Sequence, residues 1–539
     1  MALTRRQALG TAIAATAATG VTLTGTAQAS TRSALWKEFT AQPYTHPQIP
    51  YVARAGARAE PGTPGRATVV RHPGKGDAAP AINRALREAG EAGGGTVALE
   101  AGTYEIGDVV RIAHSGVTLR GAGSGRTTLR PTRSLTELIG PYGSRYGGDK
   151  SSWSWAGGLV WVCPDARWKS LTAAIRAEDW PFEGWTGNAR DEWESLTALE
   201  GGRRGDWTVR VTDPGALRPG GLVLLRLSDD EGHTLLRHMA GDVPGAAGYS
   251  WSDKTKLVSY VPYEWPVRVE EVRGSEVRLE RPLPLDARPE WRPELTTLVR
   301  PVERSGVTGL TVAFDETEQS PHLLDKGYNG VVLQCAYDCR VEDVRVVNAD
   351  NGFGLVAASA CTLRGTRVSG RGSHHPYFCR EGSHDNLVED FRIDRRTVPA
   401  PPGAQLHGIN VEGLSSHNVW SRGTMETGTF DTHRGMPFAN VRTEITVRND
   451  GRHGGDASAG PLYGARFAHW NVTVTNERAG CVKIDEIAPY SATVGISEVR
   501  EFDQIDEPDF AGELRTRAEA YGDPGGVRPR NLYEAQRAL

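Results

Sequence analysis

The sequence predicts an all-β protein built as a solenoid of parallel coils, with an N-terminal capping helix and a small β-barrel-like insertion. Short segments with alternating β-branched side chains recur in the C-terminal half, and the first two begin at Cys339 and Cys361. One strand-and-turn unit stacked on its copies produces such a repeat. Between residues 150 and 300, a Trp-rich stretch and short strands with tight turns interrupt the pattern, which indicates an inserted small β domain.

Six segments are identified as successive coils. They are Cys339–Asp350, Cys361–Gly372, Asp385–Arg396, His417–Gly428, Ala439–Asp450 and the looser Ala468–Ala479. Cys339 and Cys361 share a register, so they should stack about 4.8 Å apart on neighbouring coils. That spacing is compatible with a disulfide. However, six cysteines in 539 residues do not make a disulfide scaffold, and we predict two buried thiols.

A helix is predicted directly before the first coils. Asp77 is a plausible cap, Pro80 lies in the first turn, and Ile82, Ala85, Leu86 and Ala89 form an apolar stripe. Glycines end the helix, and the short alternating strands of GTVALEAGTYEIGDVVRI and SGVTLRGAGSGRTTLRP follow. This order resembles the opening of proteins of the pectate lyase superfamily. The resemblance implies that the solenoid is a right-handed parallel β-helix.

The first residues predict export. Arg5 and Arg6 form a twin-arginine motif, an Ala/Thr-rich stretch follows, and Ala27-Gln28-Ala29 is a small-residue cleavage site. We therefore expect secretion by the twin-arginine pathway, with cleavage after Ala29. The expected organisation is a signal peptide in 1–29, a cap and first coils in 30–149, the insertion in 150–300, the main β-helix with the active-site coils in 301–500, and a C-terminal tail or end cover in 501–539.

The charge balance argues against a nucleic-acid partner. The net charge is −4, and loss of Arg5 and Arg6 with the signal peptide would make it −6, whereas nucleic-acid binding needs a basic face. No run is apolar enough to span a bilayer, so no membrane association is expected after cleavage. The expected partner is a polysaccharide or oligosaccharide, and the sequence leaves the oligomeric state open.

Polar side chains gather before the third, fourth and fifth coils. They include His374, His375, Tyr377 and Arg380, then His407, Asn410 and Glu412, then Asp431, His433 and Arg434. When Asn386, Asn418 and Asn440 are used as anchors, His375 aligns with His407, and Arg380 aligns with Glu412 and Arg434. Equal register on parallel coils places side chains about 5 Å apart, so two adjacent polar ladders are predicted. The second ladder could equally be a purely structural row of ion pairs.

Residues 326–472 are similar to a group of secreted bacterial pectin-lyase-fold proteins. The matching stretches include KGYNGVVLQC, SHDNLVEDFRI, SSHNVWSRG and DTHRGMPFANVRTEI. The resemblance implies a polysaccharide lyase or a related carbohydrate-active enzyme, with a His-His pair before the third strand and Asp-His-His-Arg before the fifth. His374-His375 fits the first motif. Asp431-Thr432-His433-Arg434 departs from the second motif at Thr432.

The favoured hypothesis is β-elimination on a uronate-containing glycan. Arg380 and Arg434 would neutralise the substrate carboxylate, His375 or His433 would act as the base, and Tyr377 would protonate the leaving oxygen. The residues expected to bind substrate are His407, Asn410, Glu412, Arg422 and Asp431. No cofactor and no metal ligand are predicted, because the aspartates that bind calcium in pectate lyases have no matching motif, although calcium is compatible with the class.

Two alternatives stay open. A glycoside hydrolase on the same fold would use paired carboxylates, such as Glu412 and Asp431, with Asp485 as a further candidate. A glycan-binding surface protein would need no catalytic groups. The excess of histidines over clustered carboxylates favours the lyase. The sequence does not indicate the sugar, the linkage, or whether cleavage is internal or terminal.

Overall fold

The computed structural model describes residues 32–58, 67–143, 150–179, 183–186, 193–251, 257–433, 435–450, 460–478, 489–497, 517–519 and 524–539. The predicted signal peptide and its cleavage site lie outside these residues. The chain from Arg32 to Leu539 forms one compact unit. No helix in the described ranges is both long and apolar enough to cross a membrane.

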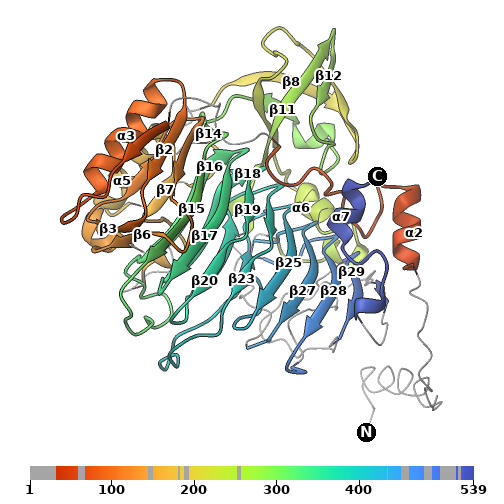
Figure 1. The fold of residues 1–539 in the computed structure, drawn as a ribbon. Coiled ribbons are helices and arrows are strands. Elements are labelled where there is room, and N and C mark those ends of the chain that lie inside the picture. Colours follow the sequence, from red (N-terminus) through yellow and green to blue (C-terminus); the bar gives the residue numbers. More distant parts are fainter. Residues whose placement is uncertain are drawn as a thin grey trace, which may run out of the picture. The chain divides into compact units, whose positions relative to one another are not determined.

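One wall of the molecule is a sheet of parallel strands that follow one another in chain order (Figure 1). Counted over the described ranges, its sixteen strands are β1 (Ala67–Val70), β2 (Gly95–Leu99), β3 (Gly102–Ile106), β5 (Val117–Arg120), β6 (Thr127–Pro131), β15 (Gly306–Ala313), β17 (Arg340–Val347), β19 (Thr362–Arg364), β20 (Arg367–Ser369), β22 (Leu387–Glu389), β23 (Arg392–Ile393), β25 (Val419–Met425), β27 (Val441–Val447), β28 (Ala468–Val474), β29 (Ala492–Ile496) and β30 (Arg517–Glu519). The six predicted coil segments all supply strands to this sheet.

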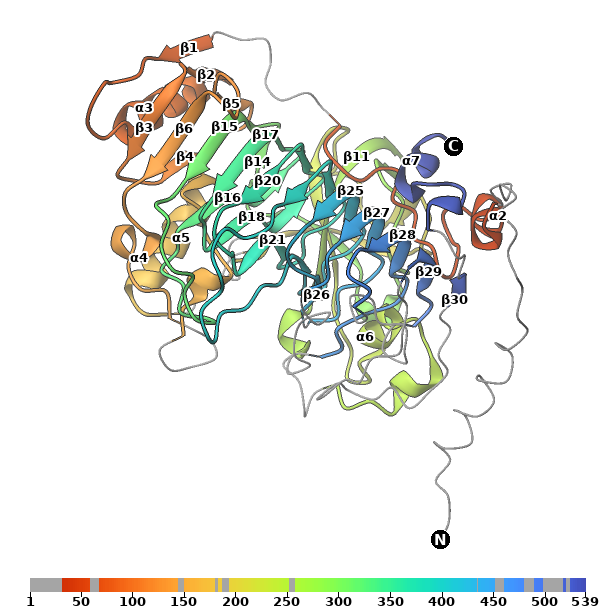
Figure 2. The same ribbon diagram turned by 60° about the horizontal axis from the view of Figure 1, so that its bottom comes forward.

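A second parallel sheet carries the candidate site. Its eight strands, among the described residues, are β4 (Val110–Ile112), β7 (Val160–Val162), β14 (Val302–Glu303), β16 (Asn329–Tyr337), β18 (Asn351–Ser359), β21 (His375–Arg380), β24 (Ile409–Val411) and β26 (Phe430–Thr432). Figure 2 shows β16, β18, β21 and β26 following one another along the stack. Because each coil gives one strand to each sheet in turn, the chain is a parallel β-helix, as predicted.

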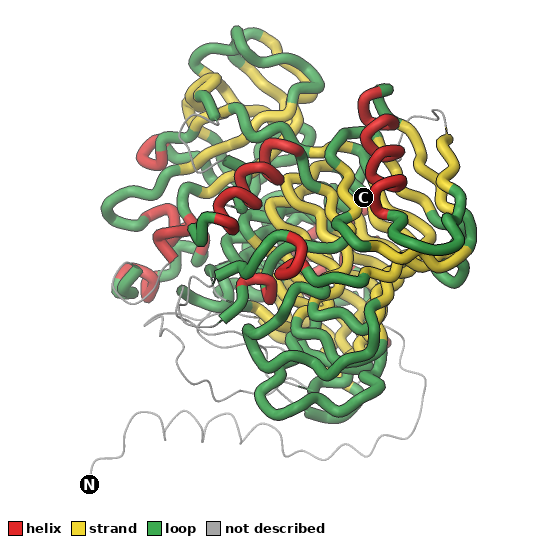
Figure 3. Tube along the Cα trace, turned by 90° about the vertical axis from the view of Figure 1, so that its left-hand side faces the viewer, coloured by secondary structure: helices red, strands yellow, loops and turns green. Residues whose placement is uncertain are grey.

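The predicted helix closes the first end of the stack. Helix α3 (Ala79–Glu91) buries Ala79, Ile82, Ala85, Leu86 and Ala89 in the main core and contacts β1, β2, β4 and β5. Figure 3 faces this end and shows helices in front of the strands. Four short helices, α2 (Ala34–Ala41), α4 (Leu135–Leu138), α6 (Thr234–Met239) and α7 (Leu532–Arg537), and the longer α5 (Asp165–Arg176) complete the α-helices of the described part.

The predicted insertion contains a closed barrel. Its antiparallel strands are β8 (Ser195–Gly201), β9 (Thr208–Val211), β10 (Leu222–Leu227), β11 (Tyr263–Arg273), β12 (Glu276–Leu279) and β13 (Glu294–Thr296). Strand β7 differs from the expectation, because it pairs with β4 and β16 and so belongs to the coils although it falls within 150–300. The barrel is fastened to the coils by Trp265, whose Nε1 donates to Asp385 Oδ2 at 2.8 Å, and by His384, whose Nε2 lies 2.9 Å from the carbonyl of Glu264.

A row of asparagines links three coils from within. Asn386 Nδ2 donates to Asn418 Oδ1 at 2.8 Å, and Asn418 Nδ2 donates to Asn440 Oδ1 at 2.9 Å. All three side chains are buried. Cys339 and Cys361 stack in the same way on neighbouring coils as buried free thiols, which confirms the prediction for this pair.

The last described residues, 524–539, cover the coils. Tyr533 on α7 donates its hydroxyl to the carbonyl of Ala55, and Gln536 Nε2 donates to the carbonyl of Pro50. A second apolar core holds Leu532 and Tyr533 together with Leu35, Trp36 and Phe39 of the N-terminal segment. The two ends of the described chain therefore pack on each other against the sixteen-stranded sheet.

Candidate active site

Histidines line up where strands of the eight-stranded sheet begin. Tyr377 pairs with Ile409, and Ile409 with Phe430, so β21, β24 and β26 are consecutive rungs. This register brings His375 beside His407, as predicted, with ring centroids 4.6 Å apart and planes 11° apart. The histidines face away from the core, toward residues of the insertion segment. The carbonyl oxygen of Ser154 accepts a hydrogen bond from His375 Nδ1 at 2.9 Å.

A single carboxylate holds the next part of the cluster together. Asp431 Oδ2 lies 3.2 Å from His407 Nδ1 and accepts a hydrogen bond from Asn410 Nδ2 at 2.8 Å. Its other oxygen, Oδ1, lies 3.4 Å from His433 Nδ1. Burial alone would raise the pKa of Asp431, but positive charge on the flanking imidazoles His407 and His433 outweighs it and holds the pKa well below the usual range. Asp431 is therefore an ionised carboxylate shared by two imidazoles.

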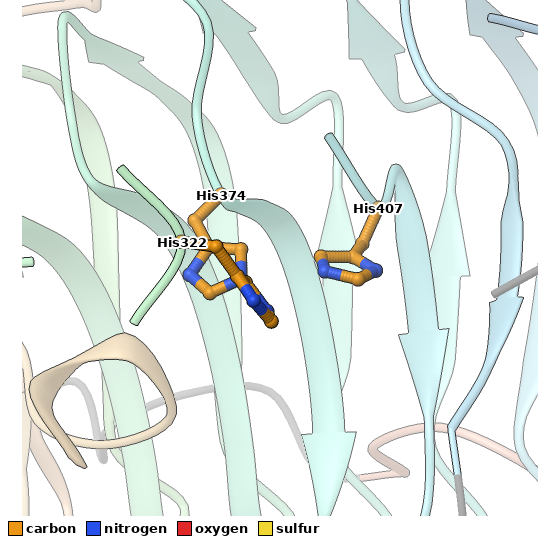
Figure 4. A group of neighbouring side chains, drawn as sticks. All are labelled: His322, His374 and His407. Carbon is orange, nitrogen blue, oxygen red and sulfur yellow. The ribbon is translucent and has the colours of Figure 1, made fainter. Parts of the chain in front are cut away.

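A second imidazole–carboxylate pair lies beside the first. His374 Nδ1 is 2.8 Å from Asp325 Oδ2, which also accepts a hydrogen bond from Ser154 Oγ at 2.5 Å. The ring centroid of His374 is 4.9 Å from that of His322 and 5.0 Å from that of His407 (Figure 4). Burial raises the pKa of Asp325 to about 6, which leaves it mostly ionised at neutral pH.

Burial keeps several of these imidazoles neutral. His375 is fully buried and His374 is 2% exposed, and desolvation lowers the pKa of both well below the ordinary value. Burial also lowers the pKa of the half-buried His322 to about 3. Neutral imidazoles are the form that accepts a proton or binds a metal. Trp155 covers the cluster, with its ring centroid 4.2 Å from that of His375 and 4.7 Å from that of His433.

Arg380 does not have the predicted freedom to meet a substrate. Its guanidinium is 2% exposed and donates to Glu183 Oε2 at 2.9 Å, to Glu381 Oε1 at 2.7 Å and to Glu412 Oε1 at 2.7 Å. The carbonyl of Trp155 accepts a further bond at 3.2 Å. Since carboxylates surround the cation, we assign Arg380 and Glu412 a structural part, which was the alternative considered for this ladder.

The predicted alignment of Glu412 with Arg434 is off by one residue. Asn410 pairs with Asp431, so the same register continues from Glu412 to His433. The step along the sequence from Asn418 to Asn440 is longer by one than the step from Asn410 to Asp431. The turn that follows β26 therefore holds one residue more than the turn that follows β24. Arg434 itself lies outside the described residues.

Two other candidates are placed away from the histidines. Tyr377 points into the core, where its ring stacks on Phe353 at 5.2 Å and its hydroxyl lies 3.0 Å from Thr366 Oγ1. A hydroxyl in this position cannot reach a sugar, so Tyr377 is withdrawn as the proton donor. Arg422 lies on β25 in the other sheet, where it pairs with Glu389, Asp390 and Glu534. The expectation that Arg422 lines the site with Asn410 and Asp431 was wrong.

Sequence reasoning missed the residues that complete the cluster from outside the repeats. His322 and Asp325 come from the loop before β16, and Ser154, Trp155 and Glu183 come from the insertion segment. The one available signal was the close spacing of His322 and Asp325 directly before a predicted strand. None of these positions belongs to the repeating pattern, so register could not place them.

A separate basic pocket lies against the other sheet. It has a volume of about 730 Å³ and is lined by Arg54, Arg58, Arg340, Arg364 and Arg537 together with Tyr44, Tyr51 and Tyr533. Arg340 and Arg364 share Glu342, so part of this charge is neutralised. The pocket and the histidine cluster therefore offer two distinct surfaces.

No protein-family model and no curated protein matches the sequence. Solved structures with related folds include the gp54 tailspike of Acinetobacter baumannii bacteriophage AP22 in complex with capsular saccharide (10% identity, TM-score 0.38, 77% of this chain and 57% of that chain). Others are the tailspike gp49 of Pseudomonas phage LKA1 (12%, 0.43, 77% and 62%) and the A-module of Azotobacter vinelandii mannuronan C-5 epimerase AlgE6 (10%, 0.34, 79% and 71%). The chain thus spans about three fifths of each tailspike.

Proposed function

We propose that the chain is an exported carbohydrate-active enzyme, a polysaccharide lyase that cleaves a uronate-containing glycan by β-elimination. The observation that carries the proposal is the buried carboxylate of Asp431, shared by His407 and His433 on consecutive rungs. A carboxylate at one ring nitrogen orients an imidazole and stabilises its protonated form, which makes the imidazole an effective base. Twin-arginine export is part of the proposal and is supported by the segment from Met1 to Ala29.

His433 is the base in this scheme. It removes the proton from the carbon beside the substrate carboxylate, and the electrons of that C–H bond form a C=C bond as the bond to the 4-linked oxygen breaks. His433 then gives the proton to the expelled oxygen, so one imidazole serves both steps. His433 and His407 are 4% and 5% exposed, and His322 is half-buried, so the cluster meets solvent on this side.

β-Elimination needs a positive group that neutralises the substrate carboxylate. Arg380 cannot be this group, because three glutamates already neutralise its charge. Arg434 remains the sequence-based candidate for this duty. Arg371 is also committed to an ion pair, since its Nη2 donates to Asp350 Oδ1 at 2.5 Å.

The test is an assay of the purified chain on uronate-containing and neutral polysaccharides, with products followed by mass and by the ultraviolet absorbance of unsaturated uronates. We expect products that are lighter by one water than the corresponding products of hydrolysis. His433→Ala should lower the rate by about 10²–10⁴-fold. His72→Gln, at a half-buried histidine beside the first coils, is the matched control and should retain the rate.

Other outcomes would overturn the lyase in favour of a named alternative. New reducing ends without absorbance would indicate hydrolysis, and Glu412 and Asp431 would then be the carboxylates to test. Glycan affinity without any product, unchanged in His433→Ala, would indicate a binding protein, for which the pocket of five arginines is the more suitable surface.

A further inference from the structure

Three imidazoles from three separate segments converge in the cluster. His322 precedes β16, His374 precedes β21 and His407 precedes β24, and each can offer one ring nitrogen within 4.8 Å of the others (Figure 4). His374 and His407 are 2% and 5% exposed, whereas the half-buried His322 lies at the solvent side. The half-buried His322 therefore gives this group its contact with solvent.

The Nε2 atoms of these rings have no hydrogen-bond partner. Those of His322, His374 and His407 are all buried and unsatisfied. A buried polar atom without a partner costs about 1–3 kcal/mol, so ring nitrogens in a core normally find a donor or an acceptor. Three of them in one place are not explained by packing.

Carboxylates beside Nδ1 of His374 and of His407 favour the tautomer with a proton on Nδ1 and a lone pair on Nε2. Asp325 lies 2.8 Å from Nδ1 of His374, and Asp431 lies 3.2 Å from Nδ1 of His407. A proton on Nδ1 leaves the Nε2 lone pair directed into the cluster. Carboxylate–histidine pairs of this type are the usual support of metal-binding imidazoles, because they fix the ring orientation and raise the basicity of the ligand.

We propose that His322, His374 and His407 bind one divalent first-row transition metal ion through Nε2, with zinc the best match. Three imidazole nitrogens do not suit calcium and magnesium, which take oxygen ligands. Three histidines with a fourth position for water or substrate are typical of zinc sites that do chemistry. Zinc–nitrogen bonds of about 2.0–2.1 Å set tetrahedral nitrogens roughly 3.3 Å apart, which small side-chain rotations can reach.

A second grouping competes for the same ion. His375, His407 and Asp431 also place ligand atoms within 4.8 Å of one another. We favour the first set because His375 stacks parallel on His407, and because Asp431 already faces His407, Asn410 and His433. The proposal goes beyond the proposed function and does not depend on it, since binding is measured without any glycan.

The experiment is zinc binding to the chelator-treated, purified chain, measured by calorimetry and by metal content after gel filtration, with cobalt absorption as a report on coordination. We expect one tightly held ion per chain and a visible cobalt band of a nitrogen-rich site. His374→Gln and His407→Gln should abolish both, and Asp325→Asn should weaken binding by about 10–100-fold. Far-UV circular dichroism verifies that each variant is folded.

Two controls make the outcome decisive. His72→Gln removes a histidine far from the cluster and should leave zinc binding unchanged, and His375→Gln should keep one equivalent. If the wild-type chain holds no more zinc than the folded His322→Gln variant, the proposal is overturned. Loss of the ion in His375→Gln with retention in His322→Gln would overturn this ligand set in favour of the second grouping. Should His374→Gln and His407→Gln fail to fold, His322→Gln and Asp325→Asn still decide the question.

Discussion

Arg380 illustrates how the coils accommodate a buried charge. Its guanidinium is surrounded by Glu183 from the insertion segment, Glu381 from the next residue and Glu412 from the next rung. Removing both members of a buried ion pair can be harmless, but removing one leaves the other charge buried without compensation. Arg380 therefore joins the insertion to β21 and fixes the position of the neighbouring histidines.

We predict that Arg380→Met destabilises the protein by about 3–5 kcal/mol, measured as the free energy of unfolding in urea, because its glutamates lose their counter-charge. Arg210→Met on the barrel removes an exposed arginine that also pairs with two glutamates, and it should change stability by less than about 1 kcal/mol. A stable Arg380→Met variant that lacks only activity would return Arg380 to the catalytic set.

Residue by residue, the sequence located the histidines better than their partners. Equal register on stacked strands is a local property, so the stacking of His375 on His407 follows from the repeat. The direction of Tyr377 could not be inferred, because alternation breaks close to the strand start and turns its ring into the core. Asp325 and Ser154 come from segments without any repeat, so only the folded chain brings them to His374.

At the scale of elements, the asparagine row carries register information from coil to coil. Asn418 donates to Asn440 Oδ1 and to the carbonyl of Ser383, both at 2.9 Å, and accepts from Asn386. An aliphatic side chain at this position could pack, but it could not satisfy these buried groups. The row therefore fixes the register of neighbouring coils and also stabilises them.

We predict that Asn418→Ala lowers the free energy of unfolding by about 1–3 kcal/mol, since it leaves buried donors and acceptors on both adjacent rungs unsatisfied. Thr446→Ala, at an exposed position of β27, is the control and should stay within about 0.5 kcal/mol of wild type. Equal effects of the two substitutions in urea unfolding would contradict a role for the row.

The repeats fixed most of the β-helix in advance, and the exceptions have a common cause. Alternating strands at a nearly constant spacing predict both the parallel pairing and the order of β17, β19, β22, β25, β27 and β28. Turn lengths are less constrained, because a turn accepts an extra residue without changing the strand. The additional residue after His433 is such a case, and it shifted the predicted partner of Glu412 by one.

On the scale of the whole molecule, many histidines are buried in neutral form. Burial lowers the pKa of His384 and of His417 to about 3, and it lowers the pKa of His469 as well. Below about pH 6.5 each of these histidines binds a proton in the unfolded chain but not in the folded chain. The free energy of unfolding therefore falls by about 1.4 kcal/mol for each histidine and each pH unit of acidification. Burial acts in the opposite sense on Asp385, whose pKa it raises to about 6, and on Glu264.

We predict that stability declines as the pH falls below about 6.5. Asp385 offsets part of the loss only below about pH 6, because the folded chain takes up its proton before the unfolded chain does. Glu264, whose pKa burial also raises, acts in the same sense. Urea unfolding of the metal-free chain at pH 7 and pH 5 measures the effect, and His417→Gln should flatten the dependence. Constant stability over this interval would contradict the burial of neutral imidazoles.

The position of the barrel in the chain affects how the molecule is assembled during synthesis. Strand β5 pairs with β15, which is synthesised much later, and Thr118 lies opposite Gly306. In the same way β7 pairs with the later strand β16, and Val160 lies opposite Val331. The barrel lies wholly between these partners and can close on itself, which leaves no free edge. The earliest coils, by contrast, expose unpaired edges until the ribosome has delivered the chain beyond β16, so the nascent chain is most prone to aggregation at its first coils.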